Sequence, residues 1–128
     1  MYKAALERGG LAVVTGAASG VGQVAALRFA EAGLGVILAD LPGDALEAAT
    51  EAVRAVSTEG ATVRAVATDV SDAQAVAELA DKAFDAGEVA VLMNNAGISR
   101  PTGSWENAAN WRKIMNVNFF GVMNGVHA

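Results

Sequence analysis

Small or polar residues follow each of four short apolar runs in this chain of 128 residues. The groups are Thr15-Gly16-Ala17-Ala18-Ser19-Gly20-Val21-Gly22, Asp40, Asp69-Val70 and Asn94-Asn95-Ala96-Gly97. Glycines leave little side-chain bulk, so a ligand can come close to the backbone of the first group. Carboxylates accept hydrogen bonds and amides both donate and accept them, so the other three groups can bind hydroxyl and amino groups.

The glycine-rich group follows Leu11-Ala12-Val13-Val14, typical of a buried parallel strand, and leads into Val24–Ala30, typical of a helix. N–H groups in a first helical turn lack intrahelical partners, and the helix dipole favours an anion there by about 0.3–1 kcal/mol. A dinucleotide diphosphate suits this position. The spacing Gly-x-x-x-Gly-x-Gly differs from the more familiar Gly-x-Gly-x-x-Gly. An ordinary glycine-rich connection is the alternative.

Asp40 follows Gly16 by 24 residues, where an acid can accept hydrogen bonds from the hydroxyls of an adenosine ribose. A 2′-phosphate beside Asp40 would bring two negative charges together, and Ala17, Ala18 and Leu41 supply no compensating cation. Asp40 therefore predicts NAD rather than NADP. A solvated acid at a strand end is the alternative.

The third and fourth groups can complete such a site. Asp69 can accept a hydrogen bond from the amino group of adenine while Val70 packs on the ring; an acid that merely precedes a helix is the alternative. Small side chains at Asn95, Ala96 and Gly97 let the cofactor's ribose pass close to the backbone, and the amides can tie neighbouring loops together. An ordinary Asn-rich turn is the alternative.

Alternating strands and helices must position these groups. The sequence predicts strands at about 11–15, 36–39, 62–67 and 89–93, and helices at about 21–32, 44–57, after Ser71 as an N-cap, and from 106 to the end. Apolar stripes predict buried helix faces at Leu46, Ala49, Val53 and Val56, and at Val76, Leu79, Ala80, Ala83 and Phe84. This order predicts an α/β fold, a doubly wound parallel sheet with helices on both faces. Ligands bind beyond the carboxyl ends of such strands, where the four groups converge.

Taken together, these motifs resemble the short-chain dehydrogenase/reductase family. Its pattern Thr-Gly-x-x-x-Gly-x-Gly stands at Thr15–Gly22, its acid at Asp40, its Asp-Val at Asp69-Val70 and its Asn-Asn-Ala-Gly at Asn94–Gly97. Asn116–Val122 looks like its Val-Asn-x-x-Gly helix, so the resemblance covers essentially the whole chain. It implies a Rossmann-type sheet of order 3-2-1-4, NAD as cofactor, and hydride transfer on a small alcohol or carbonyl substrate.

Asn118 falls on one helical face with Trp111, Ile114, Met115 and Val122. An unpaired amide on a buried apolar face costs about 1–3 kcal/mol, so we expect Asn118 to have a partner such as a backbone carbonyl or an ordered water. The resemblance implies a catalytic role, in which Asn118 holds a water of a proton relay. A buried asparagine with satisfied hydrogen bonds is the alternative.

The family's catalytic serine, tyrosine and lysine have no match in residues 1–128. The only tyrosine is Tyr2, and Leu6 stands where the Tyr-x-x-x-Lys pattern needs a lysine. Ser99 and Ser104 follow the fourth strand, whereas the family's serine follows a fifth. Hydride transfer to a carbonyl needs an acid to supply a proton. We therefore expect residues 1–128 to be one cofactor-binding domain, truncated after four strands and the following helix, without turnover alone.

The amino-acid composition argues against several classes of binding partner. The net charge of −5 without a lysine or arginine cluster argues against nucleic acid and anionic membranes. No cysteine is present, no metal site is expected, and the single histidine, His127, is next to last. We expect neither a signal peptide nor a membrane span, and a cytoplasmic location.

The predicted strand order leaves the fourth strand at an edge, and edges pair readily with other chains. The last helix also carries more apolar residues than half a sheet can cover: Phe119, Phe120, Val122, Met123 and Val126. A homo-oligomer is therefore expected. A non-enzymatic nucleotide-binding or dimerising module is the alternative function, and a methyltransferase is disfavoured because it leaves Thr15–Gly22 and Asn94–Gly97 unexplained.

Overall fold

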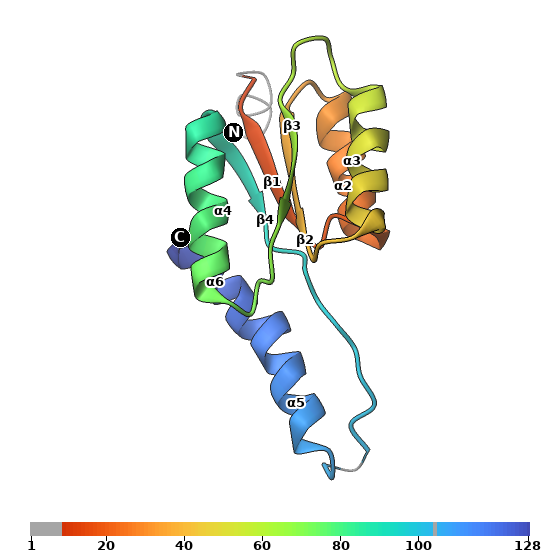
Figure 1. Cartoon of the computed structure of the whole chain (residues 1–128), viewed down its shortest axis with the longest axis vertical. Coiled ribbons are helices and arrows are strands. Elements are labelled where there is room, and N and C mark those ends of the chain that lie inside the picture. The colour runs from red at the N-terminus through yellow and green to blue at the C-terminus, as the bar shows by residue number, and fades with distance from the viewer. Residues whose placement is uncertain (1–8, 104) are drawn as a thin grey trace.

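The computed structural model describes residues 9–103 and 105–128, so Tyr2, Leu6 and Ser104 lie outside the described residues. Four strands form one parallel sheet in the order β3-β2-β1-β4, which confirms the expected topology (Figure 1). The strands are β1 (Leu11–Thr15), β2 (Gly35–Asp40), β3 (Val63–Ala67) and β4 (Val89–Met93). β4 pairs only with β1 among the described residues and is an edge strand.

Helices cover both faces of the sheet (Figure 1). One face carries α2 (Gly20–Glu31) and α3 (Asp44–Val56), and the other carries α4 (Ala73–Ala86) and α6 (Gly121–His127). Successive strand residues point to opposite faces, so Val14 packs under α2 and α3 while Val13 packs with Leu79 of α4. Every residue of β1 is buried. A strand covered on both faces must be apolar along its whole length, which is why short apolar runs predicted β1 and β2. The edge strands β3 and β4 are only partly buried.

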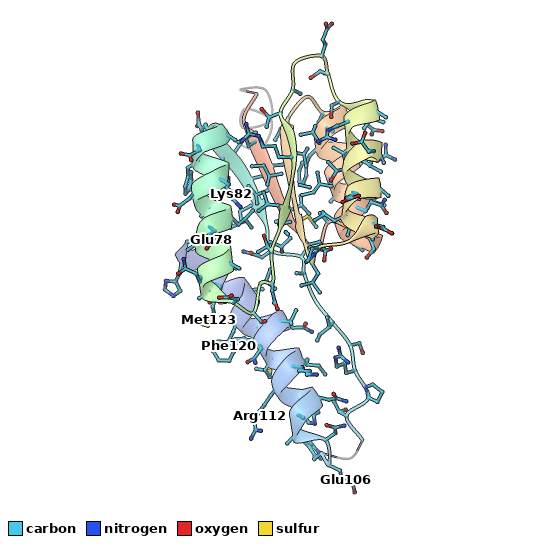
Figure 2. The ribbon with its side chains drawn as sticks, viewed as in Figure 1. Glu78, Lys82, Glu106, Arg112, Phe120 and Met123 are labelled. Carbon is cyan, nitrogen blue, oxygen red and sulfur yellow. The ribbon has the colours of Figure 1, made fainter. Side chains whose placement is uncertain are left out.

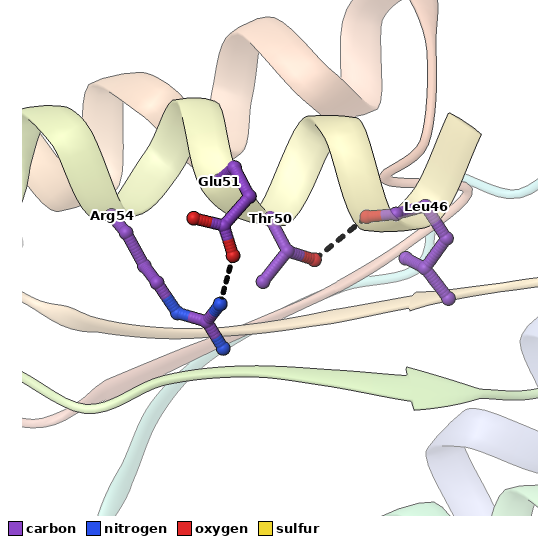
Figure 3. Close-up of polar contacts among 4 residues, drawn as sticks. All are labelled: Leu46, Thr50, Glu51 and Arg54. Carbon is purple, nitrogen blue, oxygen red and sulfur yellow. Dashed lines mark hydrogen bonds and ion pairs between the residues drawn. The ribbon is translucent and has the colours of Figure 1, made fainter. Parts of the chain in front are cut away.

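The predicted stripe of α3 is buried except at its end, where Val56 is 39% exposed. Thr50 is buried among these apolar residues, and its hydroxyl donates to the carbonyl of Leu46 at 2.7 Å (Figure 3). This bond satisfies the polar group within the helix. Arg54 pairs with Glu51 on the exposed side of α3 (Figure 3).

The start of α4 differs from the prediction, because Asp72 and not Ser71 is the N-cap. The Asp72 side chain accepts from the N–H of Gln74 at 2.9 Å, while the hydroxyl of Ser71 donates to Asp69. Phe84 was also predicted to be buried and is 62% exposed. It lines a small apolar hollow with Leu92 of edge strand β4, and no further strand in the described part of the chain covers it.

The last helix begins at Ala108 rather than 106, because the Asn107 side chain caps it by accepting from the N–H of Asn110 at 3.1 Å. It comprises α5 (Ala108–Met115), a π-helical turn η1 (Asn116–Phe120) and α6. Figure 1 shows α5 extending beyond the sheet, and no residue of α5 or η1 is buried. Over the described ranges, no helix has the length and apolar character needed to cross a membrane.

Candidate functional site

A pocket of about 350 Å³ lies where the strands end. Its lining includes nine residues predicted from the sequence: Gly16, Ser19, Val21, Asp40, Asp69, Val70, Asn95, Ala96 and Gly97. All four strand-end groups therefore share one pocket, as the convergence of parallel strands requires. Thr15, Gly20 and Gly22, which were also predicted, do not line it.

Thr15 lies behind the pocket and holds two of its lining residues in place. Its side chain is 3% exposed, and its hydroxyl oxygen accepts from the N–H groups of Asn95 and Ala96 at 3.0 and 3.1 Å. The Asn95 amide in turn donates to the carbonyl of Thr15 at 3.0 Å and of Gly16 at 3.4 Å. These bonds join the end of β4 to the glycine-rich turn after β1, which is the tie between loops expected from the asparagines.

Asp40 does more than border the pocket. One carboxylate oxygen accepts from the N–H of Ala18 at 2.9 Å, and the other accepts from the N–H of Leu41 at 2.8 Å. The carboxylate is thus held against the glycine-rich turn before any ligand binds. A carboxylate oxygen can accept more than one hydrogen bond, so Asp40 keeps acceptor capacity toward the pocket. Sequence reasoning did not predict this structural contact.

Ser19 and Val21, at the amino-terminal end of α2, line the pocket. Ser19 is the N-cap residue, with extended backbone (φ −156°, ψ 169°), but its side chain makes no capping hydrogen bond. The described lining includes the carboxylates of Asp40 and Asp69 and no lysine, arginine or histidine. An anion in this pocket would therefore have to be bound by backbone N–H groups rather than by side-chain cations.

Asn118 is exposed, so the prediction of a buried apolar face was wrong. The reason is that η1 lies with α5 beyond the edge of the sheet, where Met115 is also exposed. The prediction of a partner is confirmed, because the Asn118 amide donates to the carbonyl of Ile98 at 2.9 Å and accepts from its N–H at 2.8 Å. Asn118 does not line the pocket, but it fixes Ile98, which does.

Four lining residues were not predicted as site residues: Leu41, Thr68, Ile98 and Val117. The first three adjoin predicted groups in the sequence, so extending each group by one residue would have found them. Val117 comes from η1, far along the chain, and its signal in the sequence is its place as the valine of the Val-Asn-x-x-Gly pattern.

A family model described as short chain dehydrogenase matches residues 10–128. The chain belongs to the short-chain dehydrogenase family. It is 46% identical over 111 residues to the 1-deoxy-11-beta-hydroxypentalenate dehydrogenase of Streptomyces exfoliatus, covering 84% of this chain and 39% of that protein. It is 39% identical over 132 residues to the cis-4-hydroxycyclohexanecarboxylate dehydrogenase of Sinomonas cyclohexanicum, covering 100% of this chain and 51% of that protein.

The fold agrees with solved short-chain dehydrogenases. A short-chain dehydrogenase/reductase from Burkholderia phymatum, in complex with NAD, superposes with a TM-score of 0.85 at 40% identity. The match covers 93% of this chain and 42% of that one. The chain thus spans about half the length, or less, of the relatives it matches.

Proposed function

We propose that this chain is the dinucleotide-binding part of an NAD-dependent short-chain dehydrogenase that acts on a small alcohol or carbonyl compound. The observation that carries the proposal is the single pocket at the strand ends, which combines an uncapped helix terminus with two carboxylates and small side chains. The complex of the Burkholderia phymatum relative with NAD supports the choice of cofactor. The two curated relatives named above are dehydrogenases of hydroxylated ring compounds by name, which supports an alcohol or carbonyl substrate.

The residues present suit the parts of this cofactor. Ser19 and Val21, which line the pocket, would bind the diphosphate together with the first-turn N–H groups of the neighbouring Gly20 and Gly22. The carboxylate of Asp40 would accept from the adenosine ribose hydroxyls, and Asp69 with Val70 would bound the adenine. Gly16, Asn95, Ala96 and Gly97 would leave room for the second ribose, with Thr15 holding them in place.

Asp40→Ala is expected to weaken NADH binding about 10- to 100-fold. The substitution removes the acceptor for the ribose and also the bond that holds Ala18 in the glycine-rich turn. It also removes the charge that opposes a 2′-phosphate, so the ratio of NADPH to NADH affinity should rise. Fluorescence titration with each nucleotide measures both effects.

Asp44→Asn is the matched control for Asp40→Ala, because Asp44 is exposed at the start of α3 and does not line the pocket. It should leave both affinities within twofold of the parent. An Asp40→Ala variant that keeps the parental NADH affinity and selectivity would contradict the assignment of NAD to this pocket.

Bound NAD would supply the hydride acceptor for alcohol oxidation. The residues described here would hold the cofactor, and we propose that Asn118 acts near the substrate through Ile98 and an ordered water. A proton donor of the Tyr-x-x-x-Lys type is absent from residues 1–128, so we expect the chain alone to bind NADH without oxidising alcohols. NADH titration combined with an assay of alcohol-dependent NADH formation tests this. Lack of NADH binding would contradict the proposal.

Self-association is the second property that we propose, because the helical arm formed by α5, η1 and α6 leaves apolar side chains exposed. Phe119 is 51%, Phe120 48% and Met123 39% exposed. Figure 2 shows Phe120 and Met123 on the side of the helix opposite the 94–103 segment. Contiguous apolar surface of this kind marks interaction sites. A dimerising module without enzyme activity is the alternative function that this surface favours.

Phe120→Lys is expected to shift the chain toward a monomer in size-exclusion chromatography at micromolar concentration, because a buried charge would oppose association. Glu78→Lys on α4, also labelled in Figure 2, is the control and should leave the elution volume of the oligomer unchanged. A parent chain that elutes as a clean monomer would contradict self-association.

A further inference from the structure

Val70 forms one wall of the pocket and is held from behind by α6. It is 7% exposed and lies between the pocket and Gly121. A Cβ atom on Gly121 would lie 2.7 Å from a methyl group of Val70, so only glycine allows this contact. The Asn124 amide, one turn further along α6, donates to the carbonyl of Val70 at 2.9 Å. Side chain and backbone of Val70 are thus both fixed by a helix that is 54 residues away from it in the sequence.

The orientation of Asp69 depends on the same backbone. Its carboxylate accepts from the N–H and the hydroxyl of Ser71, at 2.9 and 2.6 Å, in a turn that runs through Val70. Asp69 is exposed at the rim of the pocket, so packing does not hold it. A turn of this kind sets the carboxylate relative to residues 69–71, and contacts outside the turn set it relative to the rest of the pocket. The N–H of Thr68, just before the turn, donates to the carbonyl of Asp40 at 2.8 Å, and the bond from Asn124 fixes Val70 in the middle of the turn.

We propose that Asn124 is a positioning residue, which holds Asp69 and Val70 where they meet the base of the dinucleotide and thereby sets a preference for adenine over hypoxanthine. The inference rests on the proposed binding of NAD in this pocket. Asn124 does not line the pocket and acts only through Val70.

Chemistry at the edge of the base gives this proposal a specific readout. Adenine carries an amino group that can donate to the Asp69 carboxylate, whereas hypoxanthine carries a carbonyl oxygen there, and two acceptors repel each other. Hydrogen bonds weaken steeply as their angle and distance depart from the optimum. If Asp69 and Val70 shift when the bond from Asn124 is lost, the pocket should lose its preference between the two bases. A variant whose fold is merely less stable should instead bind both nucleotides more weakly by the same factor.

The test compares NADH with its hypoxanthine analogue, deamino-NADH, by fluorescence titration of the whole chain. The parent is expected to bind NADH about tenfold more tightly than deamino-NADH. Asn124→Leu, of similar size but without a donor, should reduce this ratio to about two or three. Asn124→Asp keeps the shape of the side chain and places an acceptor against the Val70 carbonyl, so it should reduce the ratio as well. Val126→Leu, on an exposed position of the same helix, should keep the parental ratio.

The outcomes separate the inference from the proposed function. A parent that prefers NADH and an Asn124→Leu or Asn124→Asp variant with the same ratio would overturn the role of Asn124 and leave the NAD proposal intact. A parent that binds both nucleotides equally would also overturn it, because no preference then exists for Asn124 to support. A parent that binds neither nucleotide would overturn the proposed function, and this inference with it.

Discussion

Gly22→Ala is expected to abolish measurable NADH binding, with an affinity loss of more than about 100-fold, and to lower the free energy of unfolding by about 1–3 kcal/mol. A Cβ atom at this position would lie 2.1 Å from the carbonyl oxygen of Gly16 and 2.6 Å from the Asn95 amide nitrogen. Both are part of the tie between the glycine-rich turn and the end of β4. The first turn of α2 would have to move, and with it the N–H groups proposed to bind the diphosphate.

Gly33→Asn is the matched control for Gly22→Ala. Gly33 follows α2 at its other end with φ +92°, and no heavy atom lies within 4 Å of a Cβ atom built there. The variant should lose about 1 kcal/mol of stability from the left-handed backbone and keep the parental affinity for NADH. Urea unfolding and NADH titration measure the two quantities. A Gly22→Ala variant that binds NADH as tightly as Gly33→Asn would show that the turn does not form the diphosphate site.

Thr15→Val is expected to lower the free energy of unfolding by about 2–4 kcal/mol, although the two side chains have nearly the same shape. The substitution leaves the N–H groups of Asn95 and Ala96 without the acceptor they share in the buried Thr15 hydroxyl. An unpaired buried donor costs about 1–3 kcal/mol, and the two N–H groups that lose their acceptor here are partly buried. NADH affinity should fall about tenfold, because residues 95–97 border the pocket.

Thr15→Ser distinguishes the contribution of the hydroxyl to stability from that of the methyl group. It keeps the acceptor for both N–H groups and loses one buried methyl, so the expected cost in urea unfolding is about 1 kcal/mol. Equal losses for Thr15→Val and Thr15→Ser would mean that packing, and not the hydrogen bonds to Asn95 and Ala96, holds the two loops together.

Local pattern predicted the central strands β1 and β2 well because they are buried on both faces, whereas the edge strands β3 and β4 are only partly buried. A strand such as β1 must be apolar at every residue, and helices must connect parallel strands, so the pattern specifies a parallel sheet with helices on both faces. The strand order 3-2-1-4 came from the family resemblance. The sequence pattern predicted burial wrongly for two residues that lie at or beyond the edge of the sheet. Phe84 has the spacing of a buried residue but lies beside edge strand β4, where no further described strand covers it. Asn118 also has this spacing but lies in η1, where no residue is buried.

Site residues were predictable where they follow strands and not where tertiary packing brings them in. Asp40 and Asn95 stand directly after apolar runs, so their place at one edge of the sheet follows from topology. Val117 and Asn124 come from η1 and α6, and both the place of Val117 in the pocket lining and the bond of Asn124 to Val70 depend on how these helices pack. No spacing in the sequence specifies that packing. The hydrogen bond from Ala18 of the glycine-rich turn to Asp40 likewise depends on tertiary packing.

A crystal structure of the chain grown with NAD⁺ tests the central claim most directly. We predict the diphosphate against the N–H groups of Ser19–Gly22, the adenosine ribose within hydrogen-bond distance of Asp40, and the adenine beside Asp69 and Val70. A dinucleotide bound elsewhere on the molecule, or a ribose that makes no contact with Asp40, would contradict the account.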